Sequence, residues 1–290
     1  MKLNLNFNYK RIVLVCVLLL IVLSLSGCGY DTSLNGFNDE TNLFGWLLVW
    51  PIGWLMNTIG TFFNGSYGIA LVLTTVIVRI ISWPIYAGST SSMFKMQLAQ
   101  PDIARIQSKY AGRTDQISKN KQQAEMQAIY KKHEINPLGC MIMVFQFPIF
   151  SAMYTVIKRI TVEGGDLTLT NMSLFGFDLT SSLYSGGIGN QIFTGVLVVL
   201  VVATMFYSQY LSRKKPSYAK NIPNNNPKAQ QTQDTMKMMM YFSPILMGVM
   251  ASQDAGLALY WVVGNLFQLI QSIVIRKKQD NKYKASKNII

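Results

Sequence analysis

Long apolar segments separated by polar ones dominate this sequence, and their lengths predict helices that cross a membrane. A helix needs about 20 apolar residues to span about 30 Å of hydrocarbon. The last apolar stretch is too long for one span, and Ser252–Gly256 interrupts it with a charge and a glycine, so we read it as a tight hairpin of two helices. Five spans are therefore predicted, at about residues 67–86, 138–157, 191–211, 238–252 and 256–275. We expect an all-α, polytopic membrane protein whose core covers residues 64–275.

The amino terminus has the pattern of a secretory signal peptide. Lys2, Lys10 and Arg11 precede an apolar run that ends in Leu25-Ser-Gly-Cys28. The cysteine after the small residues resembles a bacterial lipobox, which predicts a signal peptide at 1–27 and a diacylglyceryl chain on Cys28. The alternative is an uncleaved anchor with an incidental cysteine. Residues 28–42 would then tether the lipid to the next segment.

Residues 43–63 are also apolar enough to span, but their indoles favour another placement. Trp46, Trp50 and Trp54 recur every four residues, which puts them on one helical stripe. Such a stripe suits a helix lying at the level of the lipid headgroups. A sixth span here would also reverse every later loop, so we expect an interfacial helix.

Composition and charge fix the expected orientation. Half of the 290 residues are apolar and 13% are charged, against about 25% in an ordinary soluble domain, so a water-exposed globule is excluded.

Of the 26 Lys and Arg, eight lie in 87–137, six in 212–237 and six from Arg276 onward, whereas two lie near the other ends of the spans. By the positive-inside rule these three segments are cytoplasmic and the mature amino terminus is outside. The net charge of +13 thus sets topology and meets anionic lipid before it suggests nucleic acid.

Arg79 lies inside the first predicted span, where a charge is costly. It is about 18 Å from the outer end at 1.5 Å per residue, and burial at such depth costs roughly 2–3 kcal/mol. The predicted spans contain no Asp or Glu beside it, and Asp254 belongs to the opposite face. We expect a hydrated intramembrane cavity open to the cytoplasm; the alternatives are snorkelling to the inner interface and a structural ion pair.

Other polar residues in the spans are candidates to line this cavity. Gln146 lies in the second span and Gln209 toward the inner end of the third. In the last span one helical stripe carries polar residues, namely Trp261, Asn265, Gln268 and Ser272. The alternative is that these side chains join helices through hydrogen bonds.

No residue pattern indicates bond-breaking chemistry. The sequence shows no nucleophile with a base, no phosphate loop and no metal cluster, so we expect no enzyme, cofactor or metal site. The single His133 is expected to be solvated in a polar loop, and Cys140 to be a buried structural thiol. The competing function is a small transporter or channel with Arg79 as its anion site, although no internal repeat supports it. A lipid-modifying enzyme would lack catalytic groups.

Several short motifs in a fixed order carry a family resemblance. They begin with Arg79 and run through Leu98-Ala-Gln-Pro-Asp102, Ile129-Tyr-Lys131, Asn136-Pro-Leu-Gly-Cys140, Phe145-Gln-Phe-Pro148, Phe175-Gly-Phe-Asp-Leu179, Tyr241-Phe-Ser-Pro244 and Gly256-Leu-Ala-Leu-Tyr-Trp261 with Asn265. In this order the chain resembles the YidC/Oxa/Alb family of membrane protein insertases, in particular the five-span, lipoprotein-type members of Gram-positive bacteria. One departure is Asp254, where the family usually has proline, which puts the packing of the outer hairpin in doubt.

The resemblance implies an insertase of the plasma membrane that receives nascent membrane proteins, alone or beside the Sec translocon, and releases them into lipid. Arg79, Gln146, Gln209, Trp261 and Asn265 would line its hydrophilic groove. Residues 87–137 would form a cytoplasmic helical hairpin, with Pro101 suiting a helix start and Gly112 a break.

Two further basic segments are expected to lie in the cytoplasm. Residues 212–237 are rich in Asn, Gln, Pro and Lys, which predicts a mobile loop. The basic tail, 276–290, is expected to be disordered through Lys287 and to contact either ribosomal RNA or membrane lipids.

Overall fold

The computed structural model describes residues 44–136, 142–160, 169, 171–213, 238 and 241–287. The predicted signal peptide, the tether with Cys28, the residue Cys140 and nearly all of the predicted loop 212–237 lie outside the described residues. The chain forms two compact units, one of residues 1–74 and 141–180 and one of residues 75–140 and 181–290.

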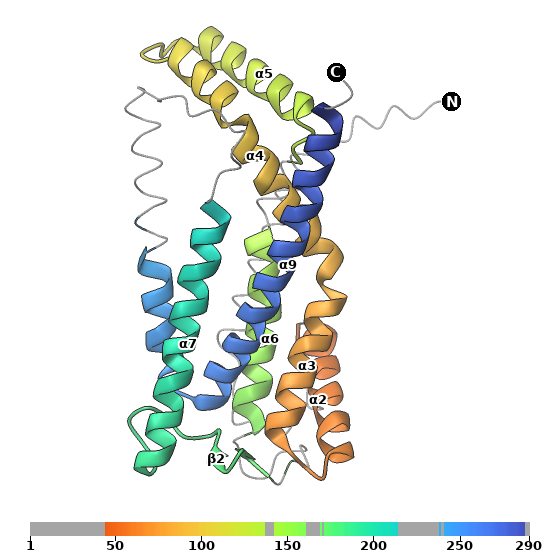
Figure 1. Ribbon diagram of the computed structural model, residues 1–290, viewed down its shortest axis with the longest axis vertical. Helices are drawn as coiled ribbons and strands as arrows, with labels where there is room; N and C mark the ends of the chain where they lie inside the picture. The colour runs from red at the N-terminus through yellow and green to blue at the C-terminus, as the bar shows by residue number, and fades with distance from the viewer. Residues whose placement is uncertain are drawn as a thin grey trace, which may run out of the picture. The chain divides into compact units, whose positions relative to one another are not determined.

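The first unit is built around helices α2 and α6. The π-helical turn η1, Gly45–Val49, leads directly into α2, Trp50–Phe62, and α6, Ile142–Ile160, packs against both (Figure 1). Trp46, Trp50 and Trp54 are exposed, as an interfacial helix would require, but their depth in a membrane stays a prediction. A two-stranded antiparallel sheet completes this unit, with β1, Ser173–Leu174, paired to β2, Phe177–Asp178.

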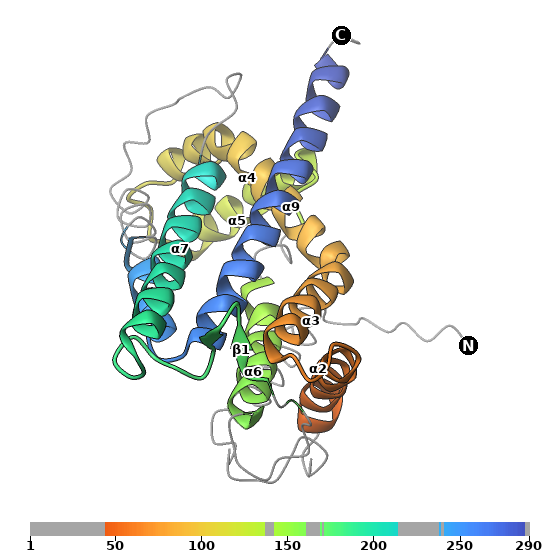
Figure 2. The same ribbon diagram turned by 60° about the horizontal axis from the view of Figure 1, so that its bottom comes forward.

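The second unit is organised by one long helix, α9, Ala255–Lys287, which packs against α7, Ile188–Arg213, and α4, Trp83–Lys109 (Figures 1 and 2). The backbone N–H of Ala255 donates to the Ser181 carbonyl near the start of both α7 and α9. Near their other ends, Arg276 donates to the Leu211 carbonyl. The two helices therefore run parallel, with the short helix Tyr241–Ala251 before α9.

Two described helices are long and apolar enough to cross a membrane, Ile188–Leu211 in α7 and Ala255–Asn281 in α9. The spans predicted at 191–211 and 256–275 fall within them. A third is possible if α3, Tyr67–Ile81, and α4 form one span that bends by 62°. The number of five spans stays a prediction.

The first predicted span, 67–86, is not one continuous helix. Helix α3 ends at Ile81, and Pro84 lies in the first turn of α4. Proline has no N–H and clashes with the preceding turn, so it fits the start of a helix better than its interior. The chain bends between the two helices, and this bend brings residues on either side of it together.

Helices α4 and α5, Gln116–Lys132, pack against each other around an apolar cluster. Ala99, Ile103 and Ile135 are its buried members, and Met96, Met126, Ile129 and Tyr130 pack against them. The expected break at Gly112 is present, because Gly112 has φ of 82° in the turn between the helices. The expected helix start at Pro101 is wrong: α4 begins at Trp83 and Pro101 lies inside it.

His133 is not the isolated, solvated side chain that the sequence predicted. Its Nε2 lies 3.0 Å from Oδ2 of Asp102, and both side chains are partly buried between α4 and the end of α5. Hydrogen bonding to His133, assisted by the charge of Lys132, lowers the pKa of Asp102 below its usual value.

The expectation of a disordered segment from Arg276 to Lys287 is also wrong, because α9 continues through it. No glycine or proline interrupts these residues. Gln279 also donates to the hydroxyl of Ser91 on α4 over 2.8 Å, which ties this part of α9 to its neighbour.

We predict that the contribution of Asp102 to α4–α5 packing depends on pH. A carboxyl whose folded-state pKa is lowered stabilises the fold above its unfolded pKa of about 3.9 and loses this effect as pH falls through the folded value. Asp102→Asn should therefore destabilise the full chain at pH 6 by less than about 1 kcal/mol, because the pair is partly exposed, and by less still near pH 3. Thermal unfolding in nanodiscs measures this, and a deficit that is equal at both pH values would contradict it.

Candidate functional site

Arg79 is buried in the second unit, near the end of α3. Its side chain is 8% exposed, although the residues on either side of it in sequence are apolar. No carboxylate lies within ion-pair distance of it among the residues that the structure describes. No described carboxylate therefore neutralises the guanidinium, and a buried charge is costly unless it is hydrogen-bonded.

Tyr86 is the polar partner of Arg79. It lies in the first turns of α4, and the bend after α3 carries its phenol back toward the guanidinium. Arg79 Nη1 donates to the Tyr86 hydroxyl over 3.1 Å, and Arg79 Cζ lies 5.6 Å from the centre of the Tyr86 ring. The sequence pointed to no partner for Arg79, and the structure supplies one in Tyr86; the hydrated cavity expected around Arg79 stays a prediction. The partner is a neutral phenol, which stabilises the charge by a hydrogen bond and by its π-face without cancelling it.

Gly264 on α9 provides the space for this guanidinium. A Cβ atom added at Gly264 would lie 2.7 Å from Arg79 Nη2 and 3.4 Å from both Cζ and Nε. A carbon atom cannot approach that closely, so any larger residue at 264 would push the guanidinium aside. Tyr86 and Gly264 together hold Arg79 between α4 and α9.

The other residues predicted for the groove on α7 and α9 mostly connect helices. Asn265 Nδ2 lies 3.4 Å from the hydroxyl of Thr204 on α7. Gln209 Nε2 donates to Ser243 on the short helix 241–251 over 3.2 Å, while Gln209 Oε1 is buried and accepts no hydrogen bond from described residues. Trp261 is buried on α9. For Asn265 and Gln209 the geometry matches the alternative reading, that polar side chains join helices.

Two predicted site residues cannot be placed beside Arg79. Gln146 belongs to α6 of the first unit, and its side chain is outside what the structure describes. Cys28 lies outside the described residues.

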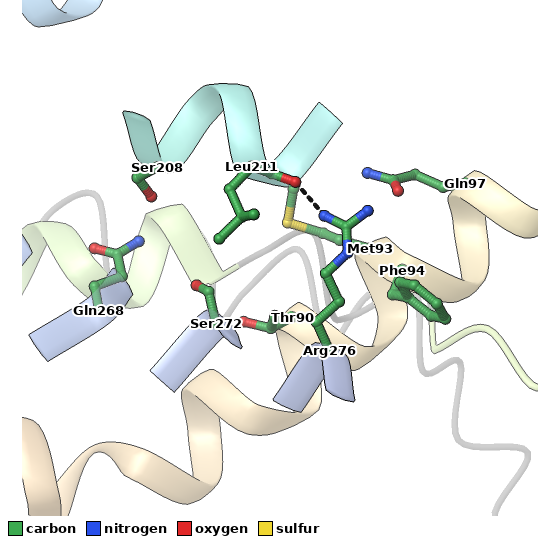
Figure 3. Close-up of a pocket in the computed structure, with 9 residues that line it drawn as sticks. All are labelled: Thr90, Met93, Phe94, Gln97, Ser208, Leu211, Gln268, Ser272 and Arg276. Atoms are coloured by element: carbon green, nitrogen blue, oxygen red, sulfur yellow. Dashed lines mark hydrogen bonds between the residues drawn. The ribbon is translucent and has the colours of Figure 1, made fainter. Parts of the chain in front are cut away.

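The structure contains a cavity of about 130 Å³ between α4, α7 and α9 (Figure 3), which is lined by two of the predicted residues, Gln268 and Ser272, but not by Arg79. Its lining residues are Thr90, Met93, Phe94, Gln97, Ser208, Leu211, Gln268, Ser272 and Arg276. Gln268 and Ser272 continue the polar stripe of α9 that starts at Trp261. Arg276 lies one helical turn after Ser272. The sequence placed it in a predicted disordered tail, 276–290, so it was not included in the stripe.

Asp254, the position at which the resemblance led us to expect proline, has a structural role. Its Oδ1 accepts a hydrogen bond from the backbone N–H of Leu257 over 3.0 Å, and its carbonyl accepts one from Ala258. This is the geometry of an N-terminal helix cap, which typically contributes about 1 kcal/mol. Asp254 therefore supports the start of α9.

Comparison with known proteins gives consistent matches over most of the chain. The family described as "60Kd inner membrane protein" matches residues 58–282. A protein of Oceanobacillus iheyensis named "Membrane protein insertase YidC" is 33% identical over 257 residues, 87% of this chain and 91% of its own length. "Membrane protein insertase YidC 2" of Bacillus anthracis is 31% identical over 85% of this chain and 86% of its own. "Membrane protein insertase MisCB" of Bacillus subtilis is 29% identical over 82% of each chain.

We predict that Gly264→Ala destabilises the protein by displacing Arg79, in spite of the higher helix propensity of alanine. Gly88 on α4 is the matched control, because a Cβ there would meet no atom within 4 Å. Gly88→Ala should be neutral or stabilising by up to about 1 kcal/mol. Gly264→Ala should cost about 1–3 kcal/mol, the usual range for overpacking.

Thermal unfolding of the full chain in nanodiscs compares these two variants. Equal stability of Gly264→Ala and Gly88→Ala would show that the guanidinium does not depend on the space at Gly264.

Proposed function

The chain belongs to the YidC/Oxa/Alb family of membrane protein insertases, and from this premise we propose that Arg79 draws polar parts of nascent membrane proteins into the bilayer. As a member of this family the chain is an integral membrane protein with an insertase role. The proposal concerns how it performs that role. The observation that carries it is a buried guanidinium whose partner, Tyr86, leaves its charge uncompensated.

The physical reason is electrostatic. A polar or acidic segment that enters hydrocarbon loses its hydration, and this loss is the main barrier to insertion. A positive charge in apolar surroundings is weakly screened, so it acts over a longer distance than a charge in water. Arg79 would lower the barrier for a passing segment without forming or breaking any bond.

We propose that Gln146, Gln209, Trp261 and Asn265 line the path of the substrate together with Arg79. The unsatisfied Oε1 of Gln209 supports this, because it offers a buried acceptor to an incoming backbone N–H. The weak contact of 3.4 Å between Asn265 and Thr204 can be exchanged for a substrate group at little cost.

The proposed topology has five spans, with the basic segments in the cytoplasm and the amino terminus outside, anchored by lipid on Cys28. Residues 1–27 would be its signal peptide, 28–42 the tether and 43–63 the interfacial helix. The parallel course of α7 and α9, with the short helix 241–251 between them in sequence, supports an odd number of crossings from α7 onward. The packed pair α4–α5 would be the cytoplasmic hairpin.

Nascent membrane proteins are the proposed substrates, received alone or beside the Sec translocon. The basic end of α9 would contact the ribosome through RNA phosphates, which require charge alone. Because α9 stays helical to Lys287, these charges would be presented on a helix.

We predict that Arg79→Ala lowers the insertion of a small single-span substrate about tenfold, equivalent to about 1.4 kcal/mol. Arg79→Lys should retain most activity because it keeps the charge. Arg105→Ala on α4, an exposed arginine, is the control and should insert normally. Proteoliposomes with a protease-protection readout measure this, and wild-type insertion by Arg79→Ala would refute a role for the charge.

Cross-linking of a stalled nascent chain tests the path directly. Cys140 is first replaced by serine, and single cysteines are placed at Gln146 and Asn265, with exposed Ile270 of α9 as the control. Labelling at 146 and 265 but not at 270 is expected, and labelling at 270 alone would exclude the groove. An anion leak in the same vesicles, abolished by Arg79→Ala, would favour the transporter alternative.

A further inference from the structure

The cavity around Arg276 has the chemistry of an anion site with apolar walls. Its side chains come from α4, α7 and α9 of the second unit (Figure 3). The polar lining groups are the guanidinium of Arg276, the hydroxyls of Thr90, Ser208 and Ser272, and the amides of Gln97 and Gln268; Ser208 and Gln97 already have partners within the protein. Its remaining lining side chains, Met93, Phe94 and Leu211, are apolar, and none of the lining residues is acidic.

Arg276 is fixed in place but keeps donors for a ligand. One nitrogen, Nη1, donates to the Leu211 carbonyl, and Cζ lies 5.8 Å from the centre of the Phe94 ring. A guanidinium carries five N–H donors in a planar fork that suits the paired oxygens of a phosphate. Among the described residues, Leu211 is the one hydrogen-bond acceptor of this side chain, so N–H groups remain for an anion.

The position of the cavity along the helices indicates which anion reaches it. The apolar span of α7 ends at Leu211, which lines the cavity. On α9 the apolar sequence ends at Ile275, directly before Arg276, and Lys277 and Lys278 follow with exposed side chains. The candidate span of α9 runs to Asn281, but its charges begin at Arg276, so we place the boundary between hydrocarbon and water at the level of the cavity on both helices. Lipid phosphates lie at this level, and basic pockets between helices on the cytoplasmic side bind anionic headgroups.

The cavity also adjoins surface that suits acyl chains. Met93 on α4 is a lining residue and is about half exposed. Tyr207 and Tyr210, next to lining residues of α7, are also exposed, and aromatic side chains with a polar tip are enriched at the headgroup level. A ligand with a phosphate at one end and hydrocarbon at the other would satisfy both surfaces.

We propose that this cavity binds the phosphodiester headgroup of an anionic glycerophospholipid, with Arg276 as the main phosphate ligand. The hydroxyls of Thr90 and Ser272 donate to the same phosphate. The bound lipid closes the space between α4, α7 and α9 at the inner face of the membrane. This site is separate from Arg79, which does not line the cavity.

The test measures lipid binding to the purified full chain by native mass spectrometry in detergent. Dioleoyl phosphatidylglycerol is compared with dioleoyl phosphatidylcholine, whose headgroup has no net charge because its choline cation balances the phosphate. We expect at least one phosphatidylglycerol to bind about fivefold more tightly than phosphatidylcholine. Arg276→Gln should weaken this binding about tenfold, whereas Lys277→Gln, which removes the same charge from an exposed position, should change it less than twofold.

A second pair of variants keeps the test informative if Arg276→Gln fails to fold. Thr90→Val and Ser272→Ala remove hydroxyl donors with little change in volume, and each should weaken phosphatidylglycerol binding about threefold. Equal losses in Arg276→Gln and Lys277→Gln would overturn the proposal, because binding would then follow net charge alone.

Competition experiments distinguish a bound lipid from a bound inorganic phosphate or acidic peptide. If inorganic phosphate at millimolar concentration displaces phosphatidylglycerol, the site takes soluble phosphate and the lipid assignment is wrong. An acidic peptide from a nascent-chain substrate that displaces the lipid through Arg276 would likewise overturn it. Insertion activity enters none of these readouts, so the result is independent of the function proposed for Arg79.

Discussion

The constraint that organises the second unit is the need to keep a guanidinium charged inside an apolar helix. Removing an isolated ion from water costs too much free energy unless other groups stabilise it, and no described carboxylate neutralises Arg79. Instead, the phenol of Tyr86 on the next helix accepts a hydrogen bond from the guanidinium, and Gly264 on α9 leaves space for it because it has no side chain. The bend between α3 and α4 brings that phenol within reach. One charge thus accounts for a proline-led bend, a buried tyrosine and a glycine far away in sequence.

Helix α9 links the two polar regions of this unit. Gly264 of this helix lies beside Arg79, and the polar stripe that starts at Trp261 reaches the cavity at Gln268 and Ser272, one turn before Arg276. At 1.5 Å per residue Gly264 and Arg276 lie about 18 Å apart along the helix. The region around Gly264 holds the charge of Arg79 away from carboxylates, whereas the cavity around Arg276 offers donors at the level where we propose that the hydrocarbon ends. The two arginines are therefore suited to different partners, a passing polypeptide and a resident phosphate.

Local sequence rules were reliable where one element decides the outcome. The apolar segments of α7 and α9, the break at Gly112 and the stripe on α9 are all visible in the sequence. These local rules failed where contacts with a second element determine the structure. Pro101 did not start a helix because α4 had already begun at Trp83, and His133 was not solvated because Asp102 of α4 lies beside it. The segment after Arg276 stayed helical, with Gln279 bound to Ser91 of α4.

The sequence by itself determined that this is a helical membrane protein, which residues are apolar, and that Arg79 needs compensation, since these follow from composition and from the 3.6-residue period. It also carried the family resemblance that the comparisons confirm. Only the tertiary structure decided what compensates Arg79 and where a cavity opens. Periodicity tells which face of a helix a residue occupies, but not which residue, 185 positions later at Gly264, lies opposite that face.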